Sequence, residues 1–178
     1  MPFNLMKKYP DLLELNHFSQ KQRDESLRRV FDRDLTNNNS FQYNGKRIYP
    51  IKTDGKPDLD REFMHLTTER IKDEQGNNCN VYDRHRSERL HWIRTHIDKN
   101  IHDSDVEVFS TIERDKANRV DVMRTYIYNK TRKYVIVLHP QYRNDNYAYY
   151  LLTAYYLNKD YGEKEMQKKM KKKMDIIL

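Results

Sequence analysis

The 178 residues carry a formal charge of +7, and charged residues make up 34% of the chain against 37% hydrophobic ones. This composition fits one domain with a modest core and favours a polyanion such as nucleic acid as the partner, with a basic protein that binds no polyanion as the alternative. The single cysteine, Cys79, excludes a disulfide framework and a cysteine-based zinc site, and no apolar run reaches the roughly twenty residues that span a bilayer.

The first predicted helix begins at Ser19. Gln22 follows three residues later, which is the spacing of a capping box, and the asparagine run 37–39 is expected to end the helix. Charged residues interrupt the preceding stretch 1–15, so we expect no signal peptide and no membrane partner. A reducing, cytoplasmic setting follows from these two expectations.

The middle of the chain combines a hairpin with two further helices. Asn44-Gly45 predicts a tight hairpin, because both residues tolerate positive φ, and the proline and glycine content of 50–57 predicts a loop. A helix is expected over 59–72 and another over 82–100. The second of these is the best defined, with one apolar face formed by Leu90, Ile93 and Ile97.

The C-terminal half is dominated by strand signals. They fall near 106–112, 120–128, 134–139 and 147–157. A helix over 163–174 follows, with methionines on one stripe and lysines around the rest. It is either a surface helix that packs its methionines on the domain or a flexible basic helix that grips RNA or an acidic partner. Helices followed by an antiparallel meander indicate the α+β class.

Two arginines in the predicted helix 82–100 are candidates for phosphate binding. Arg86 shares the apolar face of the helix and needs an anionic partner, which is either the nearby Asp83 or a phosphate. Arg89 lies about 60° to one side of Arg86. His91 is expected to face solvent, and His85 and His96 to lie together on the flank of the helix, so we discount all three as catalytic bases. No residue spacing matches a known metal-ligand pattern.

His65 is the better candidate for proton transfer. Apolar residues and two hydroxyls surround it over 62–68, so its pKa can be perturbed, although a lone histidine in such a setting often has a structural role. In the last strand, alternation places Leu151, Thr153 and Tyr155 on one face. The two hydroxyls can orient a phosphate, or these residues are there because they favour strands.

Lys130, Arg132 and Lys133 crowd the turn before the strand near 134–139. Cations at the end of a sheet can grip a phosphate. Alternatively, they keep an exposed hairpin tip soluble.

These segments together resemble the BECR ribonucleases, the superfamily that groups barnase, EndoU, colicin tRNases and RelE-like toxins, and within it the phage- and mobile-element-associated branch. The segments that carry the resemblance are 63–67, 86–93, 134–138 and 152–155. Their order is more specific than any one of them. The resemblance implies a nuclease core over 61–160. The flanking segments lie outside the resemblance: a helical and hairpin extension over 1–60, which either completes the fold or binds a partner, and a Lys- and Met-rich helix over 161–178.

The resemblance also implies a fold and a reaction. The fold would have N-terminal helices packed on a twisted antiparallel sheet of about four strands. The reaction would be metal-independent cleavage of RNA without a cofactor, in which the 2′-hydroxyl attacks the adjacent phosphate. In this scheme His65 is the base or acid, and Arg89 with Arg86 clamps the phosphate. Thr153 and Tyr155 position the phosphate, and Tyr155 is a candidate proton donor.

Two functions follow as expectations. The first is a toxin or antiphage effector that cleaves cellular tRNA or mRNA and is neutralised by an acidic antitoxin or immunity protein. The second is a non-catalytic nucleic-acid-binding or assembly protein of mobile-element origin, in which lysines bind the backbone and tyrosines stack on bases.

Overall fold

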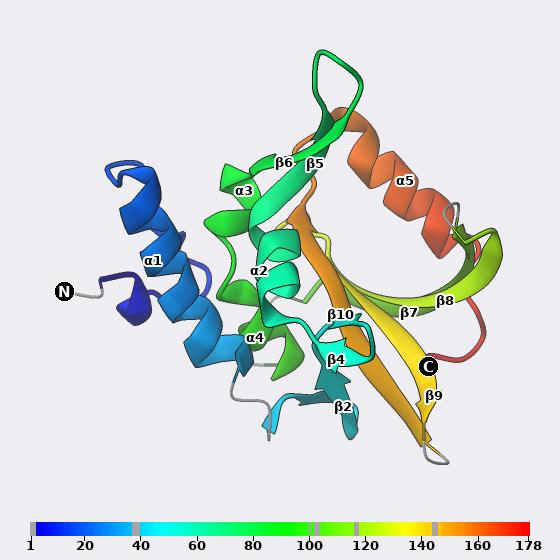
Figure 1. The fold of residues 1–178 in the computed structure, drawn as a ribbon. Coiled ribbons are helices and arrows are strands. Elements are labelled where there is room, and N and C mark those ends of the chain that lie inside the picture. Colours follow the sequence, from blue (N-terminus) through cyan, green and yellow to red (C-terminus); the bar gives the residue numbers. More distant parts are fainter. Residues whose placement is uncertain (1–2, 37–39, 100, 102–103, 116–117, 144–145) are drawn as a thin grey trace.

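A mixed six-stranded sheet forms the centre of the computed structural model, which describes residues 3–36, 40–99, 101, 104–115, 118–143 and 146–178 (Figure 1). The strand order is β1 (Gln42–Tyr43), β2 (Lys46–Tyr49), β10 (Asn146–Tyr156), β9 (Tyr134–Arg143), β8 (Val120–Asn129) and β7 (Val106–Asp115). Strands β7 to β10 form an antiparallel meander. Strand β2 runs parallel to β10 and pairs with it only at Tyr149 and Tyr150.

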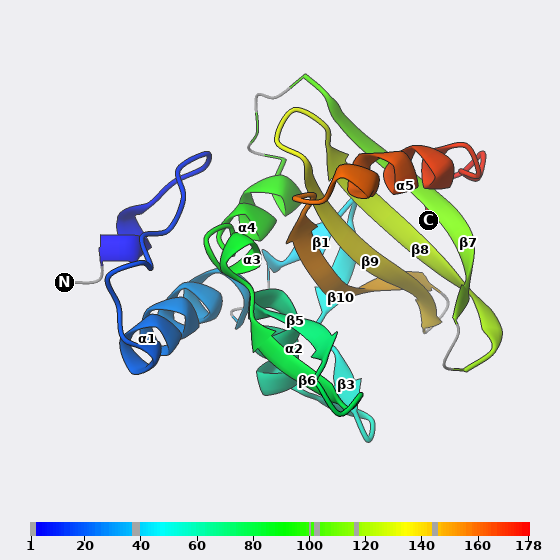
Figure 2. The ribbon, with the colours of Figure 1, turned by 90° about the horizontal axis from the view of Figure 1, so that it is seen from above.

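Helices lie on both faces of this sheet (Figures 1 and 2). The first face carries a 3₁₀ turn, η1 (Phe3–Met6), together with α1 (Gln20–Phe31), a π-helical turn η2 (Asp32–Thr36), α2 (Leu59–Thr67), α3 (Arg84–Ser87) and α4 (Trp92–Ile97). The other face carries α5 (Asp160–Met170). Two small hairpins, β3 (Lys52–Thr53) with β4 (Lys56–Pro57) and β5 (Thr68–Lys72) with β6 (Asn78–Tyr82), complete the described elements.

The class is α+β, but the expected arrangement of about four antiparallel strands under N-terminal helices is wrong. The largest sheet has six strands in the described residues and is mixed. The two additional strands are β1 and β2, the Asn44-Gly45 hairpin, which adds to the edge of β10. Helices are also spread along the chain, with α3 and α4 between strands and α5 near the C-terminus.

Several local predictions are confirmed. The Ser19 side chain accepts a hydrogen bond from the Gln22 backbone, and the Gln22 side chain accepts one from the Ser19 backbone, which is a complete capping box. Asn44 and Gly45 both have positive φ in the β1–β2 turn. All four C-terminal strand signals correspond to strands β7 to β10. The expected end of the first helix at 37–39 lies outside the described residues.

Both central helices are shorter than predicted. The helix expected over 59–72 ends at Thr67, and the chain continues as β5 because the Asp73 carboxylate, which accepts hydrogen bonds from the backbone amides of Gln75 and Asn77, closes a hairpin with β6. The helix expected over 82–100 is interrupted between α3 and α4. The loop predicted at 50–57 contains the short β3–β4 hairpin.

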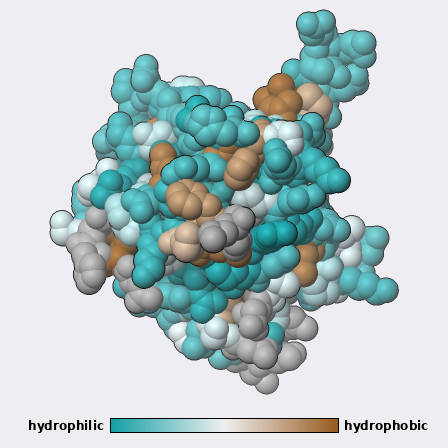
Figure 3. Space-filling view, turned by 90° about the vertical axis from the view of Figure 1, so that its left-hand side faces the viewer, coloured by the Kyte–Doolittle hydropathy of each residue, from teal (hydrophilic) through white to brown (hydrophobic). Residues whose placement is uncertain are grey.

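Two hydrophobic clusters fill the space on either side of the sheet. The larger cluster joins α1, α2 and α4 to one face, with Leu90, Ile93 and Ile97 buried as predicted. The smaller cluster lies under α5, where Met166 is buried and Met170 packs against it. This packing agrees with the surface-helix alternative for the methionine stripe. The face of the molecule in Figure 3 is mainly hydrophilic, with a group of apolar side chains near its centre. Phe3, Met6, Leu12 and Phe18 of the N-terminal segment are exposed.

A bulge in β10 changes which side chains share a face. Leu151 pairs with Leu138 and Thr153 with Val137, so Leu152 is an extra residue in the strand. Leu151 therefore joins the larger cluster, whereas Thr153 and Tyr155 face the other way. The predicted alternation was right to pair Thr153 with Tyr155. It was wrong to place Leu151 beside them, because a strict period of two does not survive a bulge.

One buried carboxyl lies beneath α2. The Glu62 side chain is almost completely buried, and burial raises its pKa to about 8 despite a hydrogen bond from the Ile51 backbone, which lowers it. Glu62 is therefore largely protonated in the folded chain at neutral pH and ionised in the unfolded chain. The stability that its protonated form contributes is complete below pH 4.5 and is lost as the pH rises to about 8.

We expect Glu62→Gln to stabilise the protein progressively as pH rises, because the amide stays neutral in both states. The gain over the parent should be small at pH 5 and about 3 kcal/mol at pH 7, at 1.36 kcal/mol for each unit of pKa difference. Urea unfolding at several pH values measures it, with the exposed Glu74→Gln as the matched control. Parallel stability curves for the parent and Glu62→Gln would contradict the burial argument.

Candidate functional site

The C-terminal end of α2 positions the first candidate side chain, His65. The helix begins at Asp58, whose carboxylate accepts hydrogen bonds from the Arg61 amide and the Thr53 hydroxyl at 2.9 and 2.7 Å. It ends just after His65, where the hydroxyls of Thr67 and Thr68 donate to backbone carbonyls one turn earlier. Because both ends are fixed, α2 holds His65 at a defined place beside β10.

His65 lies on a polar groove of about 920 Å³ between α2, the β5–β6 hairpin and β10. The walls of this groove are formed by Thr53, Asp58, Asp60, Arg61, Met64, His65, Thr68, Glu69, Arg70, Asn78, Asn80, Arg86 and Thr153. Three of the predicted site residues, His65, Arg86 and Thr153, therefore meet there from three different elements. The size of the groove is in the range of binding sites for small molecules or for a few nucleotides.

Arg86 is held in place by three hydrogen bonds. Its Nε donates to the Asp83 carboxylate at 3.1 Å, and its Nη1 donates to the His65 carbonyl at 3.0 Å and to the Thr153 hydroxyl at 3.2 Å. Asp83 was one of the two partners predicted for Arg86. No described residue accepts a hydrogen bond from Nη2, so the two N–H donors of this nitrogen are left for a ligand.

The electrostatic setting of His65 favours its neutral form. Partial burial of the imidazole lowers its pKa below the ordinary 6.5, and the positive charges of Arg61, Arg86 and Arg70 lower it further. His65 is nevertheless exposed to solvent. A neutral, accessible imidazole at pH 7 has a free nitrogen lone pair that can accept a proton.

Tyr155 lies next to this groove, on a smaller cavity of about 210 Å³ that shares Arg86 and Glu69 with it. The Arg86 guanidinium is 5.8 Å from the centre of the Tyr155 ring. Burial, and next the negative charge of Glu113, raises the pKa of the Tyr155 hydroxyl to about 12. Tyr155 is therefore protonated at neutral pH and can donate a hydrogen bond or a proton.

Arg89 does not join Arg86. Its Nη1 donates to the His85 carbonyl at 3.0 Å, and its guanidinium stacks on the Tyr156 ring at 4.0 Å. It is buried and lines neither of the two cavities described above. The predicted pair of clamping arginines is therefore not assembled, because the chain turns between α3 and α4 and Arg89 enters the core.

The basic turn between β8 and β9 lies outside the groove as well. Lys130 forms an ion pair with Glu107 at 2.6 Å, and Lys133 forms one with Glu163 at 3.2 Å. Arg132 lies 6.0 Å from the centre of the Tyr9 ring. Because carboxylates already neutralise the two lysines, their geometry does not favour the predicted phosphate grip.

The three histidines of the second helix differ from their predicted positions. His91 was expected to face solvent, but it is 3% exposed. His96 is also buried, with its ring nitrogens 2.7 Å from the Trp92 carbonyl and 3.1 Å from the Asn129 amide. His85 is partly exposed and packs on Tyr156. The break between α3 and α4 reorients the chain, so the angles of a continuous helix do not apply.

Sequence reasoning missed two arginines of the groove, Arg61 and Arg70. Arg61 precedes His65 by four residues, and this helical spacing could have placed both on one face of α2. Arg70 could not have been found in this way, because it lies on β5, a segment that was predicted to be helical.

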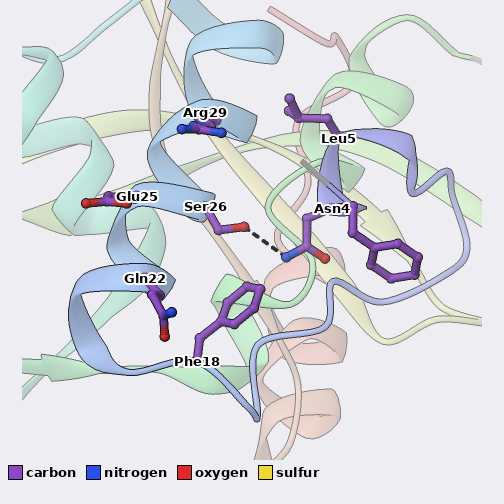
Figure 4. Close-up of a pocket in the computed structure, with 8 residues that line it drawn as sticks. Asn4, Leu5, Phe18, Gln22, Glu25, Ser26 and Arg29 are labelled. Carbon is purple, nitrogen blue, oxygen red and sulfur yellow. Dashed lines mark hydrogen bonds between the residues drawn. The ribbon is translucent and has the colours of Figure 1, made fainter. Parts of the chain in front are cut away.

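Another cavity, about 310 Å³ in volume, lies between η1 and α1 (Figure 4). Its buried polar group, Asn4, already donates to the Ser26 hydroxyl at 2.9 Å and to the Glu14 carbonyl at 3.0 Å, and accepts from the Glu14 amide at 2.8 Å. These bonds attach the N-terminal segment to α1. With its polar atoms satisfied, the cavity has a structural explanation.

The part of the chain that the structure describes contains no group of three or more side chains able to hold a metal ion. None of its helices has both the length and the apolar character needed to cross a membrane. Comparison of the chain with protein-family models, with curated proteins and with solved structures finds no match. The resemblance to the BECR ribonucleases therefore stays a prediction.

Proposed function

We propose that this chain is a metal-independent endoribonuclease whose active site is the groove around His65, Arg86 and Thr153. The observation that carries the proposal is the convergence of a neutral imidazole, a fixed guanidinium and a hydroxyl from α2, α3 and β10. These are the groups that transfer of a phosphoryl group to a neighbouring hydroxyl requires: a base, a stabiliser of negative charge and a positioning donor.

In this mechanism the His65 imidazole removes the proton of a ribose 2′-hydroxyl. The resulting oxygen attacks the adjacent phosphorus, and the bond to the 5′-oxygen of the next nucleotide breaks. The products are a 2′,3′-cyclic phosphate and a 5′-hydroxyl. Arg86 stabilises the charge that develops on the phosphoryl oxygens, because its guanidinium is already oriented before the substrate binds.

Tyr155 is the proposed proton donor for the leaving oxygen. Its hydroxyl is protonated at neutral pH and lies on the cavity next to the groove, where Arg86 lines both spaces. The base and the acid would then lie on opposite sides of the phosphate that Arg86 binds. Thr153 accepts a hydrogen bond from Arg86 and donates a long one, 3.5 Å, to the His65 carbonyl, so it positions the guanidinium beside His65.

The biological role that we propose is that of a toxin or antiphage effector acting on cellular RNA in the cytosol. The +7 charge supports a polyanionic substrate, and the lone cysteine, Cys79, is free, as suits a reducing compartment. An enzyme that cuts cellular RNA endangers its own host, so we also propose an acidic antitoxin or immunity protein that covers the basic side chains of the groove.

We expect His65→Ala to reduce RNA cleavage by about 100-fold or more, because the general base is lost. Binding of RNA should change little, since phosphate affinity comes mainly from arginines and lysines. The measurement uses the full chain with total RNA and transfer RNA in excess EDTA, followed by a sequencing gel and analysis of the product ends.

The matched control is His17→Ala, which removes an exposed histidine that lines neither the groove nor its neighbour. It should cut like the parent. If the parent protein leaves the RNA intact but retards it on a native gel, the chain is a nucleic-acid-binding module and not a nuclease. Cleavage that disappears in EDTA would contradict the metal-independent mechanism.

We expect Arg61→Gln to move the acidic limb of the pH–activity profile to higher pH. Arg61 is the largest source of positive charge among those that lower the pKa of His65, so its removal makes the imidazole easier to protonate and inactivates the base at a higher pH. The titration of the His65 ring by NMR should shift in the same direction, also without RNA.

The exposed Arg114→Gln, which removes the same charge outside the groove, is the control for this experiment. A profile that moves equally in both variants would indicate a general effect of net charge. An NMR shift without a change in the activity profile would show that His65 is not the base, and would leave the electrostatic description of the groove intact.

A further inference from the structure

A second polar cavity lies on the N-terminal side of the molecule, away from the residues assigned to cleavage. It is open to solvent, has a volume of about 570 Å³, and is lined by residues of η1, of the segment after η1, of η2 and of α4. Its walls are formed by Leu5, Met6, Lys7, Lys8, Tyr9, Arg33, Asp34, His91, Arg94 and Thr95. None of these residues lines the groove around His65.

The cavity contains a buried side chain whose polar atoms have no partner. His91 is only 3% exposed, and neither ring nitrogen makes a hydrogen bond within the described residues. The Asp11 backbone is near enough to favour the charged ring slightly, but it does not reach hydrogen-bonding geometry. A buried imidazole without partners is costly, so a ligand that supplies them would be bound favourably.

The charge around the cavity indicates the kind of ligand. Four of the lining residues, Lys7, Lys8, Arg33 and Arg94, are cationic, and only Asp34 is acidic. Asp34 is already used, because Arg33 holds it with two hydrogen bonds of 2.6 Å. Lys7 and Arg94 are likewise paired, with Glu14 at 2.6 Å and Asp98 at 2.7 Å. Lys8 is exposed and has no ion-pair partner among the described residues. One positive charge at the cavity is therefore left without a carboxylate, which favours an anion.

We propose that this cavity binds a phosphate monoester, with His91 as its buried hydrogen-bonding partner and Lys8 as the unpaired positive charge. A monoester offers anionic oxygens as acceptors and, in its singly protonated form, an O–H donor, so it satisfies His91 in either tautomer. A carboxylate offers acceptors only. The cavity is large enough for a mononucleotide, and the apolar side chains of Leu5 and Met6 are available to its organic part.

The ester can come from two sources, a free mononucleotide or the 5′-phosphate at the end of an RNA chain. Both present the same group. The inference does not depend on the proposed nuclease activity, because the two sets of residues do not overlap.

The test is a titration of the full chain with adenosine 5′-monophosphate, followed by NMR signals of the histidine rings and by calorimetry. The expected result is a shift of the His91 signals by the nucleotide and none by adenosine, which lacks the phosphate. Lys8→Gln should weaken binding about 10-fold, as for the loss of one charged contact. Lys21→Gln, which removes an exposed lysine that lines no cavity described here, should leave it unchanged.

His91→Phe keeps the aromatic volume and removes both nitrogens. It should abolish the heat of nucleotide binding measured by calorimetry, while circular dichroism shows that the protein remains folded. Lys8 lies on the surface, and its variant keeps the test valid if His91→Phe does not fold. Equal binding of adenosine and its monophosphate would overturn the proposal. So would a nucleotide that moves the His65 signals and leaves those of His91 in place.

A short RNA with a 5′-phosphate, compared with the same RNA bearing a 5′-hydroxyl, separates the two sources. Tighter binding of the phosphorylated RNA, lost in Lys8→Gln, identifies an RNA end as the ligand. Binding of the mononucleotide alone identifies a free small molecule. Failure of both phosphates to bind at millimolar concentration contradicts the inference.

Discussion

The hydrogen bonds of Arg86 hold the candidate site together. One guanidinium joins its own helix α3 through Asp83, the end of α2 through the His65 carbonyl, and β10 through the Thr153 hydroxyl. Thr153 is 67 positions away from Arg86 in the sequence and His65 is 21. Among the described groove residues, no other side chain forms hydrogen bonds to all three elements. An arginine suits this role because it presents several donors in one rigid plane.

The bulge in β10 makes that arrangement possible. Leu151 pairs with Leu138 and faces the large hydrophobic cluster. Without the extra residue Leu152, Thr153 would follow the same alternation and face this cluster too, where no polar partner is available. Bulges often redirect side chains beside functional sites. The effect here is to take the Thr153 hydroxyl out of the large cluster to a position where it accepts the hydrogen bond from Arg86.

The sequence was informative where the structural signal is local. The Ser19 cap, the Asn44-Gly45 turn, the four long strands and the buried stripe of Leu90, Ile93 and Ile97 depend on residues close together in the chain. The pairing of Thr153 with Tyr155 on one face was also predictable, because both follow the bulge.

The remainder depended on contacts between distant segments. The pairing of β2 with β10 joins residues far apart in sequence, and nothing in the hairpin itself indicates which edge it will find. Arg89 and His91 are buried because the chain is interrupted between α3 and α4. Their predicted positions were based on the angles of one continuous helix. Tertiary packing overrode local propensity at both places.

The parallel pairing of β2 with β10 has a consequence for how the molecule folds. Tyr149 and Ile48 are about a hundred residues apart, so closing this contact costs more chain entropy than forming each hairpin of the neighbouring meander of β7 to β10. The meander can therefore assemble early and the β1–β2 hairpin should join late. Strand β2 covers the β10 edge only as far as Tyr150, and α2, which follows the hairpin in the chain, packs on β10 as well. The groove would then be among the last parts to form, and a newly made chain would remain without an assembled site until nearly all of it had folded.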